Sequence, residues 1–379
     1  MKPFAIFAAD LHLAPRTRAS FPTMCNDAYF GLHQLVDMAN EKQLPLVFCG
    51  DIFDKAMVDS YTLQIYIDEL SRLDPKLCLY AIEGDHELAA PRWFEFSKRA
   101  VALADQPVTL NGINLVGVDF QRADTLPDKL KAAATVFDQT DCTVDNTILV
   151  THEGWAEMRQ LGHTEGKFSD VHKFQLMVSG DFHTPGIWNG TNAAGAPLSV
   201  YSPGATCMQS VSEVPEKWAL EGFVDTDAGG LIGFKPIPLK TRPFFKMQIT
   251  DNESAEAYLT QCWRLASGQV DVTGLPPELH TPFVYIETQI ELQQVANELR
   301  KLAKQLHLHV VYRKQVETAA PISSSIRTDS RLDMVHALRQ RATSDAVCND
   351  VLDLWRAESP ADVVAAIKRR IEQNAVSQT

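Results

Sequence analysis

The chain has 379 residues and an ordinary globular composition, with 45% hydrophobic and 22% charged residues. This length predicts two or three domains with separate cores, and the composition excludes collagen-like and largely disordered proteins. The longest apolar runs are strand-sized, well below the roughly 18–20 residues of a membrane-spanning helix, so the sequence predicts no membrane segment. The seven cysteines are scattered and form no C-x-x-C pair, which disfavours a disulfide framework and a thiolate zinc site.

The net charge is −13, which by itself argues against nucleic acid as a partner, because phosphates are bound by Lys and Arg. The negative charge is concentrated in the first 290 residues, whereas residues 291–379 carry a small positive excess. Most of these carboxylates are expected on the solvated surface, and the remainder are available as metal ligands.

The amino-terminal apolar run ends at the carboxylate of Asp10 and has no small-residue cleavage site. It is therefore expected to be the first strand of a cytoplasmic protein. Short apolar runs and amphipathic stretches then alternate, with strands expected at 4–9, 45–49 and 77–82 and helices at 27–40 and 61–73. This alternation predicts a layered α/β domain.

Further strands are expected at 113–118, 147–151, 176–179, 198–201 and 244–249, with a hairpin around Asp227. A small α/β unit follows, with helices expected at 253–266 and 292–306 and strands at 283–290 and 308–312. Helical patterns then cover 331–341, 345–357 and 360–374. The sequence therefore predicts three domains, at 1–250, 251–320 and 326–379.

Five short segments place Asp or His directly after a predicted strand. They are Asp10-Leu-His12, Gly50-Asp51, Gly84-Asp85-His86, Thr151-His152 and Gly180-Asp181-Phe182-His183. Because the carboxyl ends of strands in an α/β sheet face one crevice, these side chains are expected to converge. Carboxylates with a few imidazoles are ligands for two divalent cations such as Mn²⁺, Mg²⁺ or Fe²⁺.

This order of motifs resembles the calcineurin-like metallophosphoesterase superfamily, over about 200 residues. The resemblance implies a four-layer β-sandwich flanked by helices. It implies one metal held by Asp10, His12, Asp51 and His183, and a second held by Asp51, Asp85, His152 and Asp181, with Asp51 bridging. His86 would act beside the scissile phosphate, with Glu87 orienting its ring.

Two positions depart from the family pattern. Asp85 stands where the family has an amide, and Asp181 stands where it has the first histidine of G-H-x-H. Both replace a neutral ligand by an anion, so the site approaches formal neutrality with two dications. Oxygen in place of imidazole also favours Mn²⁺ and Mg²⁺.

A narrower resemblance, to SbcD-type DNA double-strand-break repair exonucleases of bacteria or phages, follows the last motif. It is carried by Gly50-Asp-Ile-Phe-Asp54, by Ser202-Pro-Gly-Ala, by Glu213 and by Trp218–Phe223. It implies an exonuclease and endonuclease for DNA repair and recombination that hydrolyses phosphodiesters with a metal-activated hydroxide, preferably with Mn²⁺. It also implies a homodimer, a small capping domain that recognises DNA, and carboxy-terminal helices that bind an SbcC-like coiled-coil ABC ATPase.

Two other functions fit the motifs. A small-molecule phosphoesterase of the same fold, such as a nucleotidase or a cyclic-nucleotide phosphodiesterase, would carry the same residues up to His183. A DNA-end-binding scaffold subunit with a weakened site would explain Asp85 and Asp181. The Ser202-Pro-Gly-Ala segment and the additional domains favour the nuclease over the first, and intact Asp51 and His86 favour it over the second.

Overall fold

The computed structural model describes residues 1–15, 24–88, 91–139, 142–159, 164–225, 230–250, 252–288, 301 and 305–312. The chain divides into two compact units, 1–314 and 315–379. The second unit lies outside the described residues, as do its three predicted helices and nearly all of the helix predicted at 292–306. No helix in the described ranges is long and apolar enough to cross a membrane.

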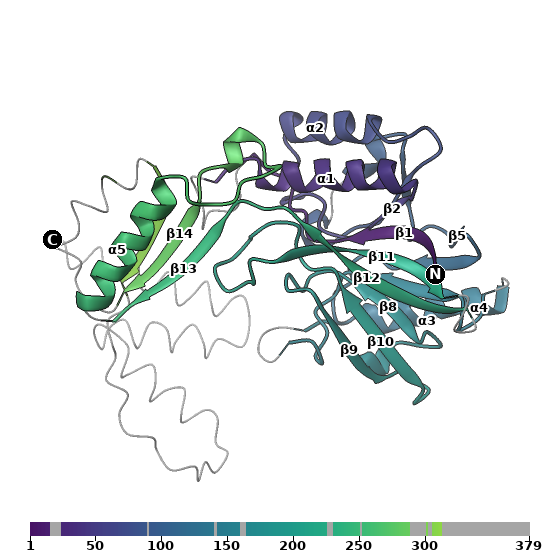
Figure 1. Cartoon of the computed structure of the whole chain (residues 1–379). Coiled ribbons are helices and arrows are strands. Elements are labelled where there is room, and N and C mark those ends of the chain that lie inside the picture. The colour runs from purple at the N-terminus through teal and green to yellow at the C-terminus, as the bar shows by residue number, and fades with distance from the viewer. Residues whose placement is uncertain are drawn as a thin grey trace, which may run out of the picture. The chain divides into compact units, whose positions relative to one another are not determined.

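The first sheet has six strands in the order β12-β11-β1-β2-β3-β4. These are β1 Lys2–Ala8, β2 Leu46–Cys49, β3 Leu79–Ile82, β4 Ala100–Ala102, β11 Lys217–Asp225 and β12 Leu231–Leu239. Strands β1 to β4 are parallel, whereas β11 pairs antiparallel with both β1 and β12. The helices α1 (Asp27–Lys42) and α2 (Ser60–Ser71) lie together against one face of this sheet (Figure 1).

The second sheet also has six strands, in the order β5-β6-β7-β8-β10-β9. These are β5 Val108–Leu110, β6 Ile113–Gly117, β7 Thr147–Thr151, β8 Leu176–Ser179, β9 Gly186–Thr191 and β10 Pro197–Ser202. The helices α3 (Leu126–Ala134) and α4 (Val136–Gln139) follow β6 in the chain, and α3 packs on the outer face of this sheet.

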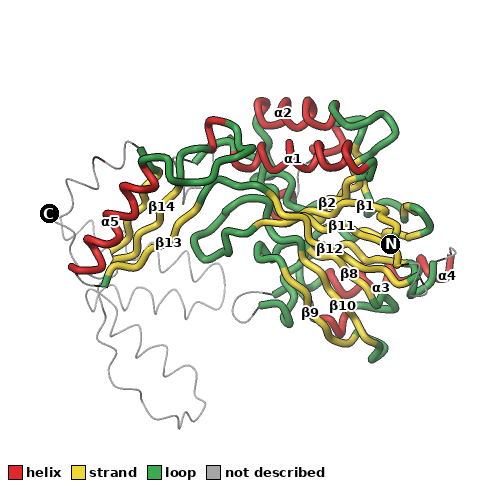
Figure 2. Tube along the Cα trace, viewed as in Figure 1, coloured by secondary structure: helices red, strands yellow, loops and turns green. Residues whose placement is uncertain are grey.

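Side chains that alternate along each strand divide between an outer and an inner core. Phe48 of β2 packs towards the helices, while its neighbour Val47 faces the second sheet. The inner core joins both sheets, with Phe7 and Val47 from the first against Ile148 and Val178 from the second. Helices, two sheets and helices form four layers, as predicted, and Figure 2 shows the two sheets between their helices.

A third sheet contains three parallel strands, β13 (Phe244–Ile249), β14 (Phe283–Thr288) and β15 (His307–Tyr312). The helix α5 (Asn252–Ala266) packs on it, and Met247, Cys262 and Ile286 belong to a core of its own. Strand β13 pairs with β14 rather than with the sandwich, so the small sheet begins before the boundary expected near Thr250.

Several elements were not predicted from the sequence. The strands β4, β5 and β9 and the helix α3 have no counterpart among the expected elements. The short 3₁₀ helices Asp85–Glu87, Trp93–Phe96, Phe168–Asp170 and Pro277–Leu279 are also additional. β4 and β5 have only three residues each, too few for an alternating pattern to be recognised.

Candidate metal centre

The five Asp and His motifs converge where the strands of both sheets end. Asp10, His12 and Asp51 follow β1 and β2 of the first sheet, and His152 follows β7 of the second. All four are at most 2% exposed. Buried carboxylates facing buried imidazoles are costly unless a partner of opposite charge is present, so the arrangement predicts a bound cation.

The backbone at these positions is unusual. Asp10, His12, Asp51 and Asp181 all have positive φ, between 48° and 70°, a region that Asp tolerates better than most residues. Gly50, which precedes Asp51, has φ +86°, and a Cβ there would collide with the ring of His152. The Gly-Asp pair therefore allows the loop after β2 to approach His152 closely.

One group of ligand atoms gathers around His12. Its Nε2 lies 3.2 Å from Nε2 of His183 and 3.5 Å from Oδ2 of Asp51. Oδ1 of Asp10 lies 3.8 Å from the same atom of His183. Ligands of one cation at roughly 2.1 Å lie about 3–4 Å from each other, so this group can hold an ion.

A second group gathers around His152. Its Nε2 lies 3.5 Å from Oδ2 of Asp51 and 3.7 Å from Oδ1 of Asp85. Asp181 offers a further oxygen within 4.8 Å of the ligand atoms of Asp85 and His152. Because Oδ2 of Asp51 is 3.5 Å from His12 and from His152, Asp51 lies between the two groups, as expected of a bridging ligand.

The ring nitrogens are oriented for metal binding. Nδ1 of His152 lies 2.7 Å from the carbonyl oxygen of Cys49, and Nδ1 of His183 lies 2.9 Å from Oε1 of Glu213. Each ring can donate its proton there and present the Nε2 lone pair to the centre. Oδ2 of Asp10 and Nε2 of His152 are buried, with no hydrogen-bond partner among the described residues. These atoms fit a pair of divalent cations.

The charges in the centre are strongly coupled. Burial raises the pKa of Asp10 to about 6, against the opposing effect of His152 and His183. Burial also raises the pKa of Asp85, but the neighbouring His152 outweighs it and lowers the value to about 2. Burial raises the pKa of Asp181, although His152 and Arg159 oppose this. Burial thus disfavours the charged forms of Asp10 and Asp181, a cost that bound cations would relieve.

The ring of His86 lies at the edge of these groups. Its side chain is 28% exposed, and it offers a nitrogen within 4.8 Å of the ligand atoms of His12 and Asp51. Its Nδ1 lies 2.7 Å from the carbonyl oxygen of Asp54, and its backbone N–H donates to Asp51 at 3.1 Å. His86 therefore lies close to the candidate ligands and is also accessible to solvent.

Glu87 has a different role from the one expected, which was to orient the ring of His86. Its buried carboxylate accepts from the backbone N–H groups of Phe53, at 2.9 Å, and Gly84, at 2.8 Å. The neighbour of the His86 ring is instead the carbonyl of Asp54. Glu87 fixes the turn that carries Asp85 and His86, because two backbone amides take up both of its oxygens.

Three further residues support the centre. Arg159 donates to Oδ2 of Asp181. Lys217, which is 1% exposed, donates to Glu213 at 2.6 Å. The sequence singled out Glu213 only as part of a family segment, and nothing in the local pattern marked Arg159 or Lys217.

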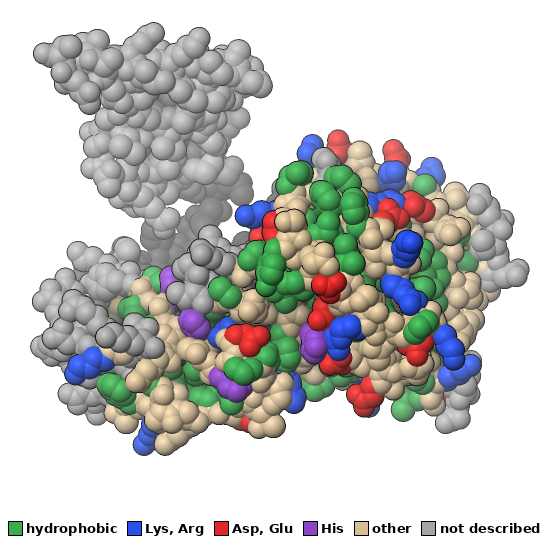
Figure 3. Space-filling model, turned by 90° about the horizontal axis from the view of Figure 1, so that it is seen from above, with side chains coloured by type: hydrophobic (Ala, Val, Ile, Leu, Met, Phe, Trp, Pro, Cys, Tyr) green, Lys and Arg blue, Asp and Glu red, His purple; other side chains and the backbone are tan. Residues whose placement is uncertain are grey.

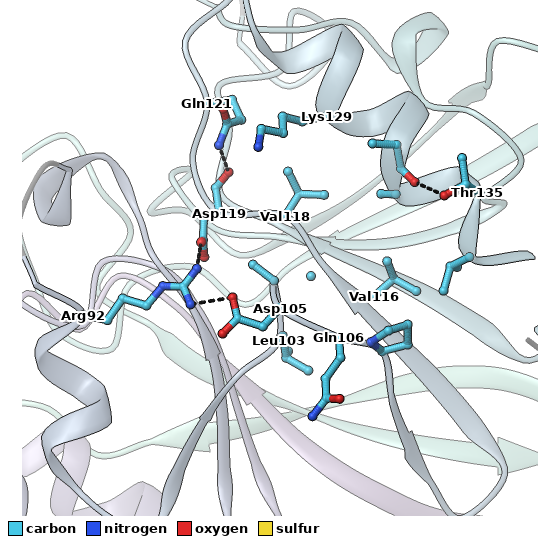
Figure 4. Close-up of a pocket in the computed structure, with 16 residues that line it drawn as sticks. Arg92, Leu103, Asp105, Gln106, Val116, Val118, Asp119, Gln121, Lys129 and Thr135 are labelled. Atoms are coloured by element: carbon cyan, nitrogen blue, oxygen red, sulfur yellow. Dashed lines mark hydrogen bonds and ion pairs between the residues drawn. The ribbon is translucent and has the colours of Figure 1, made fainter. Parts of the chain in front are cut away.

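A cavity of about 420 Å³ lies at the edge of the second sheet, between α3 and the chain after β4 (Figure 4). Arg92 in its wall pairs with Asp105 at 2.7 Å and with Asp119 at 2.6 Å. Asp119 also accepts from the backbone N–H of Glu83 at 2.9 Å. These contacts support the segment that leads from β3 to Asp85.

Comparison with known proteins identifies the domain that holds the centre. The family model "Calcineurin-like phosphoesterase" matches residues 5–185, a range that includes every candidate ligand from Asp10 to His183. The crystal structure of Vps29 from Chaetomium thermophilum is similar over 63% of this chain and 98% of its own, with 13% identity and a TM-score of 0.29. No curated protein matches the chain at a significant level.

Residues 5–185 are therefore a calcineurin-like phosphoesterase domain. This family implies a metal-dependent phosphoesterase hydrolase that binds divalent cations, in agreement with the Asp and His groups of the centre.

Proposed function

We propose that this protein is a two-metal-dependent DNA nuclease of the SbcD type, which hydrolyses phosphodiester bonds and prefers Mn²⁺. The observation that carries the proposal is the connection between the segment resembling these nucleases and the centre. Ala205 of Ser-Pro-Gly-Ala donates its N–H to the carbonyl of His183 at 3.0 Å, and Glu213 contacts the ring of His183 at 2.9 Å.

The first ion would be held by Asp10, His12, Asp51 and His183, and the second by Asp51, Asp85, His152 and Asp181. Two divalent cations bound there supply an acidified water as nucleophile and Lewis-acid stabilisation of the phosphate oxygens. Nδ1 of His86 donates to the carbonyl of Asp54, which leaves Nε2 available to the substrate. In the imidazolium form of the ring, Nε2 carries the proton that goes to the leaving oxygen. The partial exposure of this ring allows it to reach a bound phosphate.

The distribution of charge on the surface supports a requirement for partners in DNA binding. On the face shown in Figure 3, Lys and Arg side chains of the described residues are scattered among Asp and Glu rather than gathered in one basic patch. DNA binding needs neutralising cations. A coiled-coil ABC ATPase of the SbcC type and a second copy of this chain are proposed to supply them at DNA ends, with residues 326–379 binding the ATPase.

The nuclease assignment can be tested with the purified full-length protein. End-labelled duplex DNA, mononucleotides, cyclic nucleotides and bis(p-nitrophenyl) phosphate would each be incubated with Mn²⁺, Mg²⁺ or EDTA. The Asp51→Asn variant is the control, since it removes charge from both ion positions. We expect DNA cleavage with Mn²⁺ that EDTA and Asp51→Asn abolish.

Two results would contradict the assignment. Hydrolysis of nucleotides without cleavage of DNA would make the protein a small-molecule phosphoesterase. DNA binding with no hydrolysis of any substrate would make it a scaffold subunit.

A further inference from the structure

Arg159 forms an ion pair at the centre that the family pattern does not include. Its Nη2 donates to Oδ2 of Asp181, the residue that stands in place of a histidine. The Arg159 side chain is 28% exposed and that of Asp181 is 18% exposed, so the pair lies at the solvent side of the centre. The guanidinium therefore lies beside a candidate metal ligand, on the side that is open to solvent.

The backbone that carries Arg159 is well anchored. Its N–H donates to the carbonyl of Trp155 at 3.2 Å. Trp155 is fully buried, and its indole N–H donates to Ser179 at 3.0 Å, directly at the end of β8. A cation on such a support is held in place before substrate binds, which lowers the cost of ordering it.

The charges indicate what this cation does. Asp10, Asp51, Asp85 and Asp181 carry four negative charges, which two dications only balance. A centre with the family's neutral Asn and His at positions 85 and 181 would keep two positive charges for the phosphate. This chain has replaced both neutral groups by carboxylates, and Arg159 brings a positive charge back beside one of them.

We propose that Arg159 binds a non-bridging oxygen of the scissile phosphodiester and that Asp181 positions it for this role. The inference rests on the proposed phosphodiester hydrolysis. A guanidinium has five N–H donors in a planar fork, so it can bind a carboxylate and a phosphate at the same time. Asp181 thereby connects the group of Asp85 and His152 to the residue that contacts substrate.

The test uses the Mn²⁺-loaded full-length protein and the variants Arg159→Gln and Arg159→Lys. Arg122→Gln is the matched control, because Arg122 is exposed and has no side-chain contact with the centre among the described residues. Three quantities are measured: bound Mn²⁺ per chain, the affinity for inorganic phosphate, and kcat/KM for bis(p-nitrophenyl) phosphate.

We expect Arg159→Gln to keep its Mn²⁺, to bind phosphate more weakly, and to lose roughly 10²-fold in kcat/KM, as on removal of one transition-state donor. Arg159→Lys should give a phosphate affinity and a kcat/KM between those of Arg159→Gln and those of the unchanged protein. In an Asp181→His background, which restores the family's neutral ligand, Arg159→Gln should lower kcat/KM by less than 10-fold. The centre then has one negative charge fewer, so the positive charge of Arg159 contributes less.

Two results would overturn the inference. Loss of Mn²⁺ from Arg159→Gln with unchanged phosphate affinity would make Arg159 only a support of the Asp181 ligand. Phosphate affinity and kcat/KM equal to those of Arg122→Gln would remove it from the site. The model substrate separates this question from the nuclease assignment, which fails only if the unchanged protein does not cleave DNA.

Discussion

Nδ1 of His183 lies 2.9 Å from Oε1 of Glu213. The other oxygen of this carboxylate accepts from Nζ of Lys217 at 2.6 Å and from the backbone N–H of Gln209 at 3.1 Å. A buried lysine on β11 of the first sheet thus fixes, through one carboxylate, the ring of a candidate ligand that follows β8 of the second.

Substitution of Glu213 should affect both metal binding and folding. Glu213→Gln leaves the ammonium of Lys217 buried without an opposite charge, which costs about 3–5 kcal/mol of unfolding free energy. It also weakens the support of His183, for which a loss of about 10–100-fold in metal affinity is expected. Metal titration and denaturant unfolding measure the two effects.

The double variant Glu213→Gln with Lys217→Met separates them. Removing the stranded charge should recover most of the unfolding free energy while the metal affinity stays low. Equal recovery of both would contradict a separate role of Glu213 in orienting His183.

His86→Ala should lose rate without losing metal. The ring lies at the rim, oriented by the carbonyl of Asp54, so its removal deletes a proton donor and leaves the other ligands intact. A decrease of roughly 10²–10⁴-fold in kcat is expected. Metal analysis of the purified variant should still give two ions per chain, and loss of one ion would instead make His86 a ligand.

Arg92→Ala should lower the metal affinity of the centre indirectly, through the segment that leads to Asp85. Without the guanidinium, the carboxylates of Glu83, Asp105 and Asp119 face one another, and the segment before Asp85 loses a support. We expect weaker Mn²⁺ binding together with a lower melting temperature. The control is Arg99→Ala, because the Arg99 side chain donates to the carbonyl of Pro75 and to no other group in the part of the chain that the structure describes. Equal Mn²⁺ affinity in the two variants would refute the connection.

The small sheet should be sensitive to acid through His307. Burial, assisted by Arg242, lowers the pKa of His307 to about 4. In the unfolded chain this pKa is about 6.5, so between pH 6.5 and 4 the unfolded state binds more protons. The free energy of unfolding therefore falls as the pH falls through this range and is unaffected above it. His307→Gln should show a smaller decrease between pH 7 and 4 in denaturant titrations, and parallel curves would show no contribution.

Sequence patterns predicted the sandwich because its central strands are buried on both faces. The run at 147–151 and the run at 176–179 coincide with β7 and β8, since parallel strands covered on both sides are continuously apolar. The edge strand β9 alternates half-buried and exposed residues and contains two glycines, so its sequence resembles a loop. α3 has only nine residues, and its buried stripe consists of Leu126, Leu130 and Ala134.

The candidate ligands were predictable for a different reason. Each of them directly follows a strand, and the topology of parallel strands brings such positions together whatever the distance in sequence. No comparable rule predicts which residues support the ligands. Arg159 and Lys217 act through contacts made only after folding, and the orientation of His86 by Asp54 depends on a backbone carbonyl, which carries no sequence signal.

The hydrogen bond from His152 to the carbonyl of Cys49 crosses from one sheet to the other. Asp51, two residues after Cys49, faces the same ring, so candidate ligands of both sheets are locked together at the point where the sheets meet. The sheets consequently cannot shear past each other without separating these groups. Movement that admits a substrate is therefore expected in the surrounding loops rather than at this junction of the two sheets.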